Sequence, residues 1–228
     1  MVKYILFDLD ETLFDFPAAE RAAISEVMKK LGIEPSEENI RRYSEINREC
    51  WDALERGELP RERIVVLRFE RFLAERGIDF PPEEAQKKYV RALGSQHDFL
   101  EGAEELLAVL SKKYELYAVT NGLYAVQSRR IKDAALDRFF KGYFISEELG
   151  ASKPQKEFFD RAFEKIAGFR KEAAIIIGDS LQSDILGGKV AGVRTCHYNP
   201  LKKENKTEIT PDFVINNLSE IPRLLEEI

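Results

Sequence analysis

The chain has 228 residues, which is enough for one large domain or for a domain that carries an insertion. Hydrophobic residues make up 44% and charged residues 33%, the balance of a globular protein with a substantial core. The net charge of -6 provides no basic footprint for nucleic acid or for an anionic membrane surface, so neither is expected as a partner.

Two cysteines, Cys50 and Cys196, lie far apart and do not form a disulfide framework. We expect both to pack as small apolar groups in a reducing cytosol. The apolar run after Lys3 is broken by Asp8 within a few residues, which argues against a signal peptide. No stretch approaches the roughly 20 apolar residues of a membrane span. The sequence therefore predicts a cytoplasmic protein.

The first predicted element is a strand over residues 4–7, a short apolar run that leads straight into Asp8 and Asp10. Such a run is typical of a strand that is buried on both faces in a parallel sheet. Acidic residues at its end fall where open α/β sheets place their ligands. Two neighbouring carboxylates repel each other unless a cation or a proton compensates them, which favours a functional role.

Four consecutive helices are predicted next, with no strand between them. Proline near a start and glycine just past an end are the expected helix boundaries. We expect a small helical bundle, inserted directly after the first strand and covering residues 15–101. The predicted helices cover residues 18–31, 36–56, 61–76 and 82–93.

Strands and helices alternate from residue 102 onward. This alternation predicts right-handed βαβ units and a parallel sheet, so residues 1–14 and 102–228 together form a Rossmann-like α/β core. The further predicted strands cover residues 114–119, 143–146, 173–177, 194–198 and 213–215. The predicted helices between and after them cover residues 103–113, 123–135, 155–167, 181–191 and 218–228.

Acidic, hydroxyl or amide side chains follow three of the predicted strands, and a lysine lies just before a predicted helix. In a parallel sheet these strand ends meet at one edge. One Asp can attack phosphorus and a second can move the proton, while oxygen ligands hold Mg²⁺ and the lysine neutralises charge. The set consists of Asp8, Asp10, Thr120, Asn121, Lys153, Asp179 and Asp184.

Four ordered motifs carry a resemblance to a known family. They are DLDET at residues 8–12, VTNG at 119–122, SKP at 152–154 and GDSLQSD at 178–184. In order and spacing they resemble the motifs of the haloacid dehalogenase-like (HAD) hydrolase superfamily, and the match covers essentially the whole chain. The resemblance implies a HAD-like core with an inserted helical C1 cap that closes over the active site.

The resemblance implies a role for each catalytic residue. Asp8 would be the nucleophile that forms an aspartyl-phosphate. Asp10 would protonate the leaving alkoxide and then activate water. Thr120 and Asn121 would hold phosphoryl oxygens by a hydroxyl and a backbone amide, and Lys153 would pair with Asp8 and the phosphate.

The resemblance also implies a magnesium site. Asp179 would bind Mg²⁺ together with Asp8 and the backbone carbonyl of Asp10, and Asp184 would support the metal or bind it through water. No cofactor other than Mg²⁺ is implied.

Several of these residues could instead have a purely structural role. Thr120 and Ser180 are also suited to capping the helices that follow them. Lys153 taken alone would more often be a solvated surface lysine, and Asp184 an ordinary exposed acid. Gly187 and Gly188 are better explained by close packing of a helix on the sheet than by binding.

Asp10 separates the possible activities. Family members that cleave carbon–halogen bonds lack this second Asp, because a leaving halide needs no proton, so its presence favours a phosphatase. A receiver-type signalling domain also phosphorylates an Asp, but its residues come in another order and it has no cap. A non-catalytic binding module on this fold is disfavoured by the intact acidic pair.

The substrate class rests on a narrower resemblance. The segments DETLFDF, VTNG with Gln127, SEELGASKP and SDILGG resemble the non-canonical pyrimidine nucleotidase subgroup. This implies hydrolysis of nucleoside 5′-monophosphates such as UMP, dUMP or dTMP. Enzymes of the N-acylneuraminate-9-phosphatase type share much of the pattern and are the alternative. The expected partner is a small phosphorylated metabolite, and the chain is a monomer or a homodimer.

Three residues of the helical insertion are candidates for substrate contact. We hypothesise that Phe16, Asn47 and Trp51 line the cap side of the cleft. Asn47 and Trp51 are four residues apart and share a helical face, so that a ring and an amide are available to a pyrimidine. The alternative is that Trp51 belongs to the core of the cap and Asn47 is its solvated neighbour.

Overall fold

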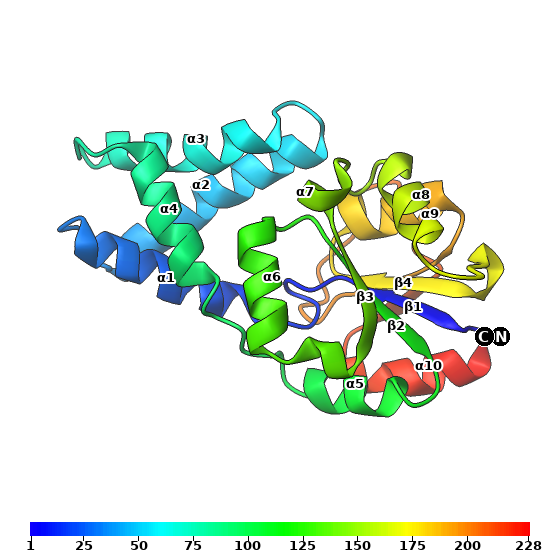
Figure 1. The fold of residues 1–228 in the computed structure, drawn as a ribbon. Helices are drawn as coiled ribbons and strands as arrows, with labels where there is room; N and C mark the ends of the chain where they lie inside the picture. The colour runs from blue at the N-terminus through cyan, green and yellow to red at the C-terminus, as the bar shows by residue number, and fades with distance from the viewer. The chain divides into compact units, whose positions relative to one another are not determined.

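The computed structural model describes residues 1–228 as two compact units, one of Met1–Asp15 with His97–Ile228 and one of Phe16–Gln96. The first unit is an α/β core built on one parallel sheet of six strands in the order β3-β2-β1-β4-β5-β6 (Figure 1). The predicted α/β fold class is confirmed. The strands are β1 (Tyr4–Phe7), β2 (Glu115–Thr120), β3 (Phe140–Ile145), β4 (Ala174–Gly178), β5 (Arg194–Tyr198) and β6 (Phe213–Ile215).

β1 lies in the middle of the sheet because all four of its residues are apolar and buried. Ile5 and Phe7 pack into one hydrophobic cluster and Tyr4 and Leu6 into another, as strand alternation requires. Helices therefore cover both faces (Figure 1). The first cluster includes α5 (Ala103–Leu110), α6 (Tyr124–Asp133) and α10 (Ile221–Glu227), and the second includes α8 (Lys156–Glu164) and α9 (Leu186–Ala191).

Two parts of the core differ from the sequence prediction. The predicted strand over residues 143–146 is longer and begins at Phe140, because Phe140 pairs with Leu116 of β2. It is followed by a short helix that was not predicted, α7 (Ser146–Leu149). The continuous helix predicted over residues 181–191 is instead a π-helical segment, Leu181–Ile185, that leads into α9.

The π segment follows from the position of Asp184. Its side chain turns inward, is 1% exposed and accepts a hydrogen bond from the backbone N–H of Ser180. A Cβ on Gly178 would lie 2.2 Å from its Oδ2 atom, so only glycine leaves room for this carboxylate. Ser180 caps the segment by accepting from the backbone N–H of Ser183, as predicted. Such π segments are often found at functional sites.

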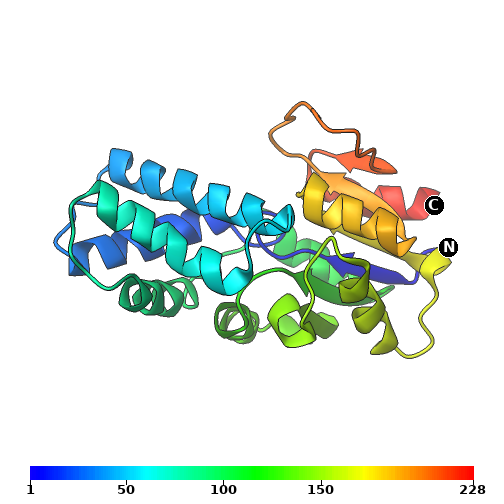
Figure 2. The same ribbon diagram turned by 90° about the horizontal axis from the view of Figure 1, so that it is seen from above.

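The second unit consists of four helices, α1 (Phe16–Lys30), α2 (Glu37–Glu55), α3 (Arg61–Glu75) and α4 (Pro82–Leu93). α2 packs along α3, and α4 packs on α1 and α3 (Figure 2). Ser36 caps α2 by accepting from the backbone N–H of Asn39. An aromatic cluster around Tyr43 fills the interior, with Phe69, Phe72 and Tyr89 at ring-centroid distances of 5.3 to 5.6 Å from it.

A buried polar network also lies inside the helical unit. Asn47 donates to Glu20 at 2.6 Å, and Arg68 donates to Asn47 at 2.6 Å and to Gln86 at 2.7 Å. All four side chains are at most 9% exposed. The interior of this unit is therefore held by paired polar groups as well as by aromatic packing.

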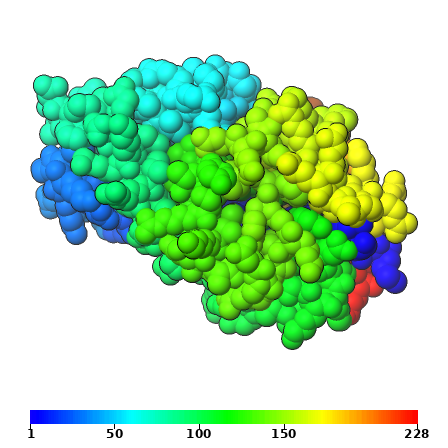
Figure 3. Space-filling view, in the orientation of Figure 1, coloured from blue at the N-terminus to red at the C-terminus, as the bar shows by residue number.

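The chain passes between the two compact units at residues 15/16 and 96/97, and the domain division at residues 14/15 and 101/102 stays a prediction. In the space-filling view the middle of the chain, coloured green to yellow, forms most of the core's visible face (Figure 3). Cys50 and Cys196 are both buried and free, as predicted. None of the helices is long and apolar enough to span a membrane.

Candidate active site

The carboxyl ends of three neighbouring strands carry the predicted catalytic set. β1 pairs in parallel with β2 on one side and with β4 on the other. Asp8, Thr120 and Asp179 stand at or directly after the ends of these strands. The parallel register therefore brings together residues that are more than 50 positions apart in the sequence, at the edge where open α/β sheets bind ligands.

Lys153 lies at the centre of this group. Its ammonium group donates to Asp8 Oδ1 at 2.6 Å, to Asp184 Oδ1 at 2.6 Å and to the Val119 carbonyl at 2.9 Å. Lys153 is 2% exposed, so it is not a solvated surface lysine. A lysine has three donors, and all of them are used here. Asp184 is likewise not an exposed acid.

Three carboxylates surround this lysine. Oxygen atoms of Asp8, Asp179 and Asp184 all lie within 4.8 Å of one another. Burial raises the pKa of Asp8 to about 8 against the attraction of Lys153. Burial also raises the pKa of Asp179 well above its ordinary value, and the charges of Asp8 and Asp184 raise it further. Burial is the main cause of both shifts, and the repulsion between the acids adds to it.

The pKa of Lys153 responds in the opposite sense. Burial lowers it, but the charges of Asp184 and Asp8 outweigh burial and raise it, so the ammonium form is held firmly. One ammonium group compensates one of the three carboxylates, which leaves two negative charges when all three are ionised.

This donor set fits a divalent cation. Mg²⁺ takes oxygen ligands and is commonly held by one or two carboxylates, and two uncompensated charges match its own. The Asp10 carboxylate does not belong to the cluster, which leaves only its backbone carbonyl for the predicted contribution to the metal.

Asp10 is held by two residues of α6 that are not among the predicted site residues. Gln127 donates to Asp10 Oδ2 at 2.6 Å, and Arg130 forms an ion pair with Asp10 Oδ1. Both side chains are fully buried. A sequence signal exists, since Gln127, Arg130, Ile131 and Ala134 fall on one stripe of the helix, and two of these inward positions are polar.

Thr120 and Asn121 make structural hydrogen bonds in addition to the phosphate contacts predicted for them. The Thr120 hydroxyl accepts from the backbone N–H of Gly122 at 3.0 Å, and it is not the N-cap of α6, which is Leu123. The Asn121 side chain donates to the Lys153 carbonyl and accepts from the Lys153 N–H, each at 2.9 Å. Asn121 therefore fixes the backbone that presents the lysine.

Two further residues support Asp179. Thr12, which is fully buried, lies 3.3 Å from Asp179 Oδ1 and donates to it through its hydroxyl. The ring of His197 lies 2.9 Å from the Asp179 carbonyl, and burial lowers the pKa of this histidine. Both contacts restrict the loop that follows β4.

The candidate substrate residues belong to the helical unit. Phe16 is the first residue of α1, and Asn47 and Trp51 lie on α2. Phe16 and Trp51 are partly exposed, whereas Asn47 is 3% exposed and bonded to Glu20 and Arg68. Asn47 is thus not a solvated neighbour of Trp51 but part of the buried network.

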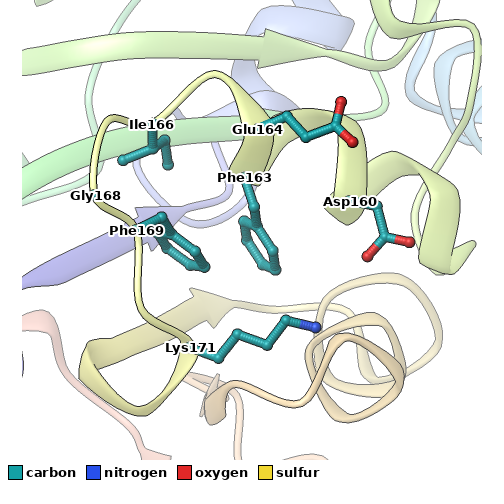
Figure 4. Close-up of a pocket in the computed structure, with 7 residues that line it drawn as sticks. All are labelled: Asp160, Phe163, Glu164, Ile166, Gly168, Phe169 and Lys171. Atoms are coloured by element: carbon teal, nitrogen blue, oxygen red, sulfur yellow. The ribbon is translucent and has the colours of Figure 1, made fainter.

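The core also has a shallow hollow away from these residues, with a volume of about 560 Å³. Figure 4 shows Phe163 and Phe169 side by side in it, with Lys171 opposite them. Their rings stack at 4.1 Å between centroids. None of the candidate catalytic residues lines this hollow, which lies beside the C-terminal end of α8.

The fold and the four ordered motifs agree with a family comparison. The sequence profile described as "Haloacid dehalogenase-like hydrolase" matches residues 5–198. The chain therefore belongs to the haloacid dehalogenase-like hydrolase family, and it is an enzyme of that family.

Three bacterial relatives match nearly the whole chain. HAD-hydrolase YfnB of Bacillus subtilis is 39% identical and covers 97% of this chain and 94% of its own length. Its solved structure, described as bound to magnesium, matches with a TM-score of 0.94 over 98% of each chain. Pyrimidine 5′-nucleotidase PynA of Streptococcus pneumoniae is 35% identical, covering 99% of this chain and 95% of its own. Pyrimidine 5′-nucleotidase YjjG of Escherichia coli is 30% identical, covering 97% of each chain.

Proposed function

We propose that this chain is a Mg²⁺-dependent phosphomonoesterase that acts through an aspartyl-phosphate. The observation that carries the proposal is the buried Lys153, which bonds to Asp8 and Asp184 beside Asp179 at the ligand-binding edge of the sheet. A lysine and three acids at one edge provide a nucleophile, compensation for phosphate charge and a cation site.

The reaction proceeds in two steps. In the first, an oxygen of Asp8 bonds to phosphorus while the bond from phosphorus to the leaving oxygen breaks, and Asp10 gives that oxygen a proton. In the second, water bonds to phosphorus, Asp10 takes its proton, and the bond to Asp8 breaks to release phosphate. Splitting the displacement this way is ordinary nucleophilic catalysis assisted by a general acid and base.

The remaining residues of the site orient the reacting groups and offset their negative charge. Lys153 keeps Asp8 oriented and offsets negative charge next to the phosphoryl group, since its pKa is raised and it stays protonated. The Thr120 hydroxyl and the Asn121 backbone amide bind phosphoryl oxygens. Asp8, Asp179 and the Asp10 carbonyl would hold Mg²⁺, with Asp184 supporting it or binding it through water, and the cation would supply electrostatic stabilisation of the transferring group.

For the substrate we propose pyrimidine nucleoside 5′-monophosphates. Two relatives named pyrimidine 5′-nucleotidase, at 35% and 30% identity over nearly the full chain, support this class. N-acylneuraminate-9-phosphatase of mouse is 25% identical, so a sugar phosphate is the alternative. Phe16 and Trp51, which are partly exposed, are proposed to contact the base, and the buried Asn47 to support them through its bonds to Glu20 and Arg68. Residues 15–101 are proposed to act as a cap.

The chemistry is tested with p-nitrophenyl phosphate. Asp8→Asn keeps the size of the side chain and its contact to Lys153 but removes the nucleophile, so hydrolysis should fall by about 10³-fold or more, as for loss of other covalent nucleophiles. Chelation of divalent cations should abolish activity, and added Mg²⁺ should restore it. Unchanged activity after either treatment contradicts the mechanism.

The substrate class is tested by comparing dUMP, a sialic acid 9-phosphate and p-nitrophenyl phosphate. Trp51→Ala should lower kcat/KM for dUMP by roughly 10-fold or more, the loss expected from removing one base-stacking ring. It should leave p-nitrophenyl phosphate unaffected, because that substrate has no base. Asn47→Ala also breaks the contacts to Glu20 and Arg68, so its unfolding must be measured alongside. Full activity of Trp51→Ala on dUMP contradicts this role.

A further inference from the structure

Gln127 and Arg130 stand one turn apart on α6, and both reach the Asp10 carboxylate. Gln127 Nε2 donates to Asp10 Oδ2 at 2.6 Å, and Arg130 Nη1 donates to Asp10 Oδ1. The two oxygens of one carboxylate are thus each held by a different residue of the same helix. Asp10 itself is 26% exposed at its side chain, so it is open to a ligand while its holders are not.

The same glutamine also connects Asp10 to Thr120. Gln127 Nε2 lies 3.1 Å from Thr120 Oγ1, so its two N–H groups serve the carboxylate and the hydroxyl. Arg130 Nη1 lies 3.3 Å from Gln127 Oε1 and donates to it, which fixes which end of the amide faces Asp10. The side chain of Gln127 therefore sets the distance between the Asp10 carboxylate and the Thr120 hydroxyl.

Both side chains lie in close packing. The amide of Gln127 fills the space beside Gly122, where a Cβ would lie 2.3 Å from Gln127 Nε2, so only glycine leaves room for it. The Arg130 guanidinium lies 4.5 Å from the ring centroid of Phe14. Burying an arginine and a glutamine completely is costly unless their polar atoms are paired, and much of that pairing here is with Asp10.

We propose that Gln127 and Arg130 are positioning residues that hold the Asp10 carboxyl group at a fixed distance from the phosphate-binding hydroxyl of Thr120. The proposal rests on the proposed function. A phosphoryl oxygen at Thr120 and the leaving oxygen belong to the same phosphate group, so a fixed spacing sets the proton donor beside the bond that breaks.

The expected consequence depends on the leaving group. Phenol leaves less readily than p-nitrophenol and gains more from a proton donated by Asp10. Loosening Asp10 should therefore slow hydrolysis of phenyl phosphate more than that of p-nitrophenyl phosphate. The two substrates have nearly the same shape, so a change in binding affects both alike.

The test measures kcat/KM for these two aryl phosphates with Mg²⁺ present, and takes the ratio of p-nitrophenyl to phenyl phosphate. The ratio does not depend on how much of a variant is folded, because both values scale with the concentration of active enzyme. Gln127→Met and Arg130→Met should each raise the ratio by roughly 10-fold, within the 10²- to 10⁴-fold range of general acid catalysis. Asp10→Asn sets the upper limit.

Two controls separate positioning from a merely structural role. Arg130→Lys keeps the charge and should return the ratio most of the way to the wild-type value. Ser128→Ala, at a half-buried position of the same helix where the hydroxyl donates to the Tyr124 carbonyl, should leave it unchanged. In an Asp10→Asn background, Gln127→Met should no longer alter the ratio, because the group that it positions is gone.

The outcomes are distinguishable. An active wild-type enzyme whose ratio is unchanged by Gln127→Met and Arg130→Met overturns this inference and leaves the proposed function standing. A wild-type enzyme that hydrolyses neither aryl phosphate overturns both. A raised ratio that Arg130→Lys restores supports positioning.

Discussion

The side chain of Asn121 makes paired hydrogen bonds to the backbone of Lys153, one to its N–H and one to its carbonyl. It thereby ties the end of β2 to the loop that carries the lysine, 32 residues later. The predicted role of Asn121 involves only its backbone amide, which any residue at this position retains. The side chain and the backbone can therefore be tested apart.

We expect Asn121→Ala to lower kcat/KM on p-nitrophenyl phosphate by roughly 10- to 100-fold, because small misplacements of catalytic groups cost about this much. Asn199 is a matched control, since it makes the same pair of bonds to the backbone of Lys203 at 2.9 Å each. Asn199→Ala should retain activity. Equal losses in both variants would show that only general stability is affected.

Thr12 provides a second test at the scale of a single residue. Its buried hydroxyl donates to Asp179, so Thr12→Val removes this bond at nearly constant volume. The concentration of Mg²⁺ needed for half-maximal activity should rise roughly 10-fold, as when a hydrogen bond to a metal ligand is lost. Thr207→Val, in the exposed loop, should not change it. An unaltered Mg²⁺ requirement in Thr12→Val contradicts the proposed metal site.

At the scale of the element, α9 illustrates how closely a helix packs on this sheet. A Cβ on Gly188 would lie 2.5 Å from Ile176 Cγ2 and 2.6 Å from Thr195 Cγ2. On Gly187 it would lie 2.6 Å from Phe159. The two glycines therefore serve packing, as predicted, and they let α9 lie close to the sheet and to α8.

Gly188→Ala should lower the free energy of unfolding by about 1–3 kcal/mol, the usual cost of overpacking a core. Val190→Ala changes an exposed residue of the same helix and should stay within about 0.5 kcal/mol of wild type. Urea denaturation measures both. A Gly188→Ala protein as stable as wild type would mean that the helix moves freely away from the sheet.

For the molecule as a whole, the buried acids couple folding to pH and to cations. Burial raises the pKa of Asp8 from its ordinary 3.8 to about 8, and that of Asp179 rises as well. The folded protein without metal thus binds these protons more tightly than the unfolded chain does. Their protonation therefore stabilises the folded state fully below pH 3.8, and this stabilisation is lost as the pH rises toward 8.

Mg²⁺ should reverse this loss, because it binds the ionised carboxylates of the folded state only. We expect the gain in Tm on adding Mg²⁺ to be larger near pH 8 than near pH 5, since protons compete with the cation at the lower pH. Thermal unfolding with and without Mg²⁺ at both pH values measures this, with NaCl of equal ionic strength as the control. A gain independent of pH would place the cation away from these acids.

The bounds of several strands and helices can be predicted from the sequence. β1, β5 and β6 have the predicted bounds, and α4 does as well. The reason is local, since continuous apolar runs, proline near helix starts and glycine past helix ends act within a few residues. The start of β3 and the π segment differ from the prediction, because pairing with β2 and the inward-turned side chain of Asp184 determine them.

Short motifs and periodicity are enough to predict the α/β core with its helical insertion, the family and the acidic residues at the strand ends, because each of these depends on residues that are neighbours in the chain. The bonds from Asn121 to the backbone of Lys153, and from Gln127 and Arg130 to Asp10, are seen only in the folded chain. These contacts join residues 32 to 120 positions apart. No local pattern encodes which buried polar groups meet, since their pairing is set by the register of the parallel strands and by the packing of α6 against the sheet.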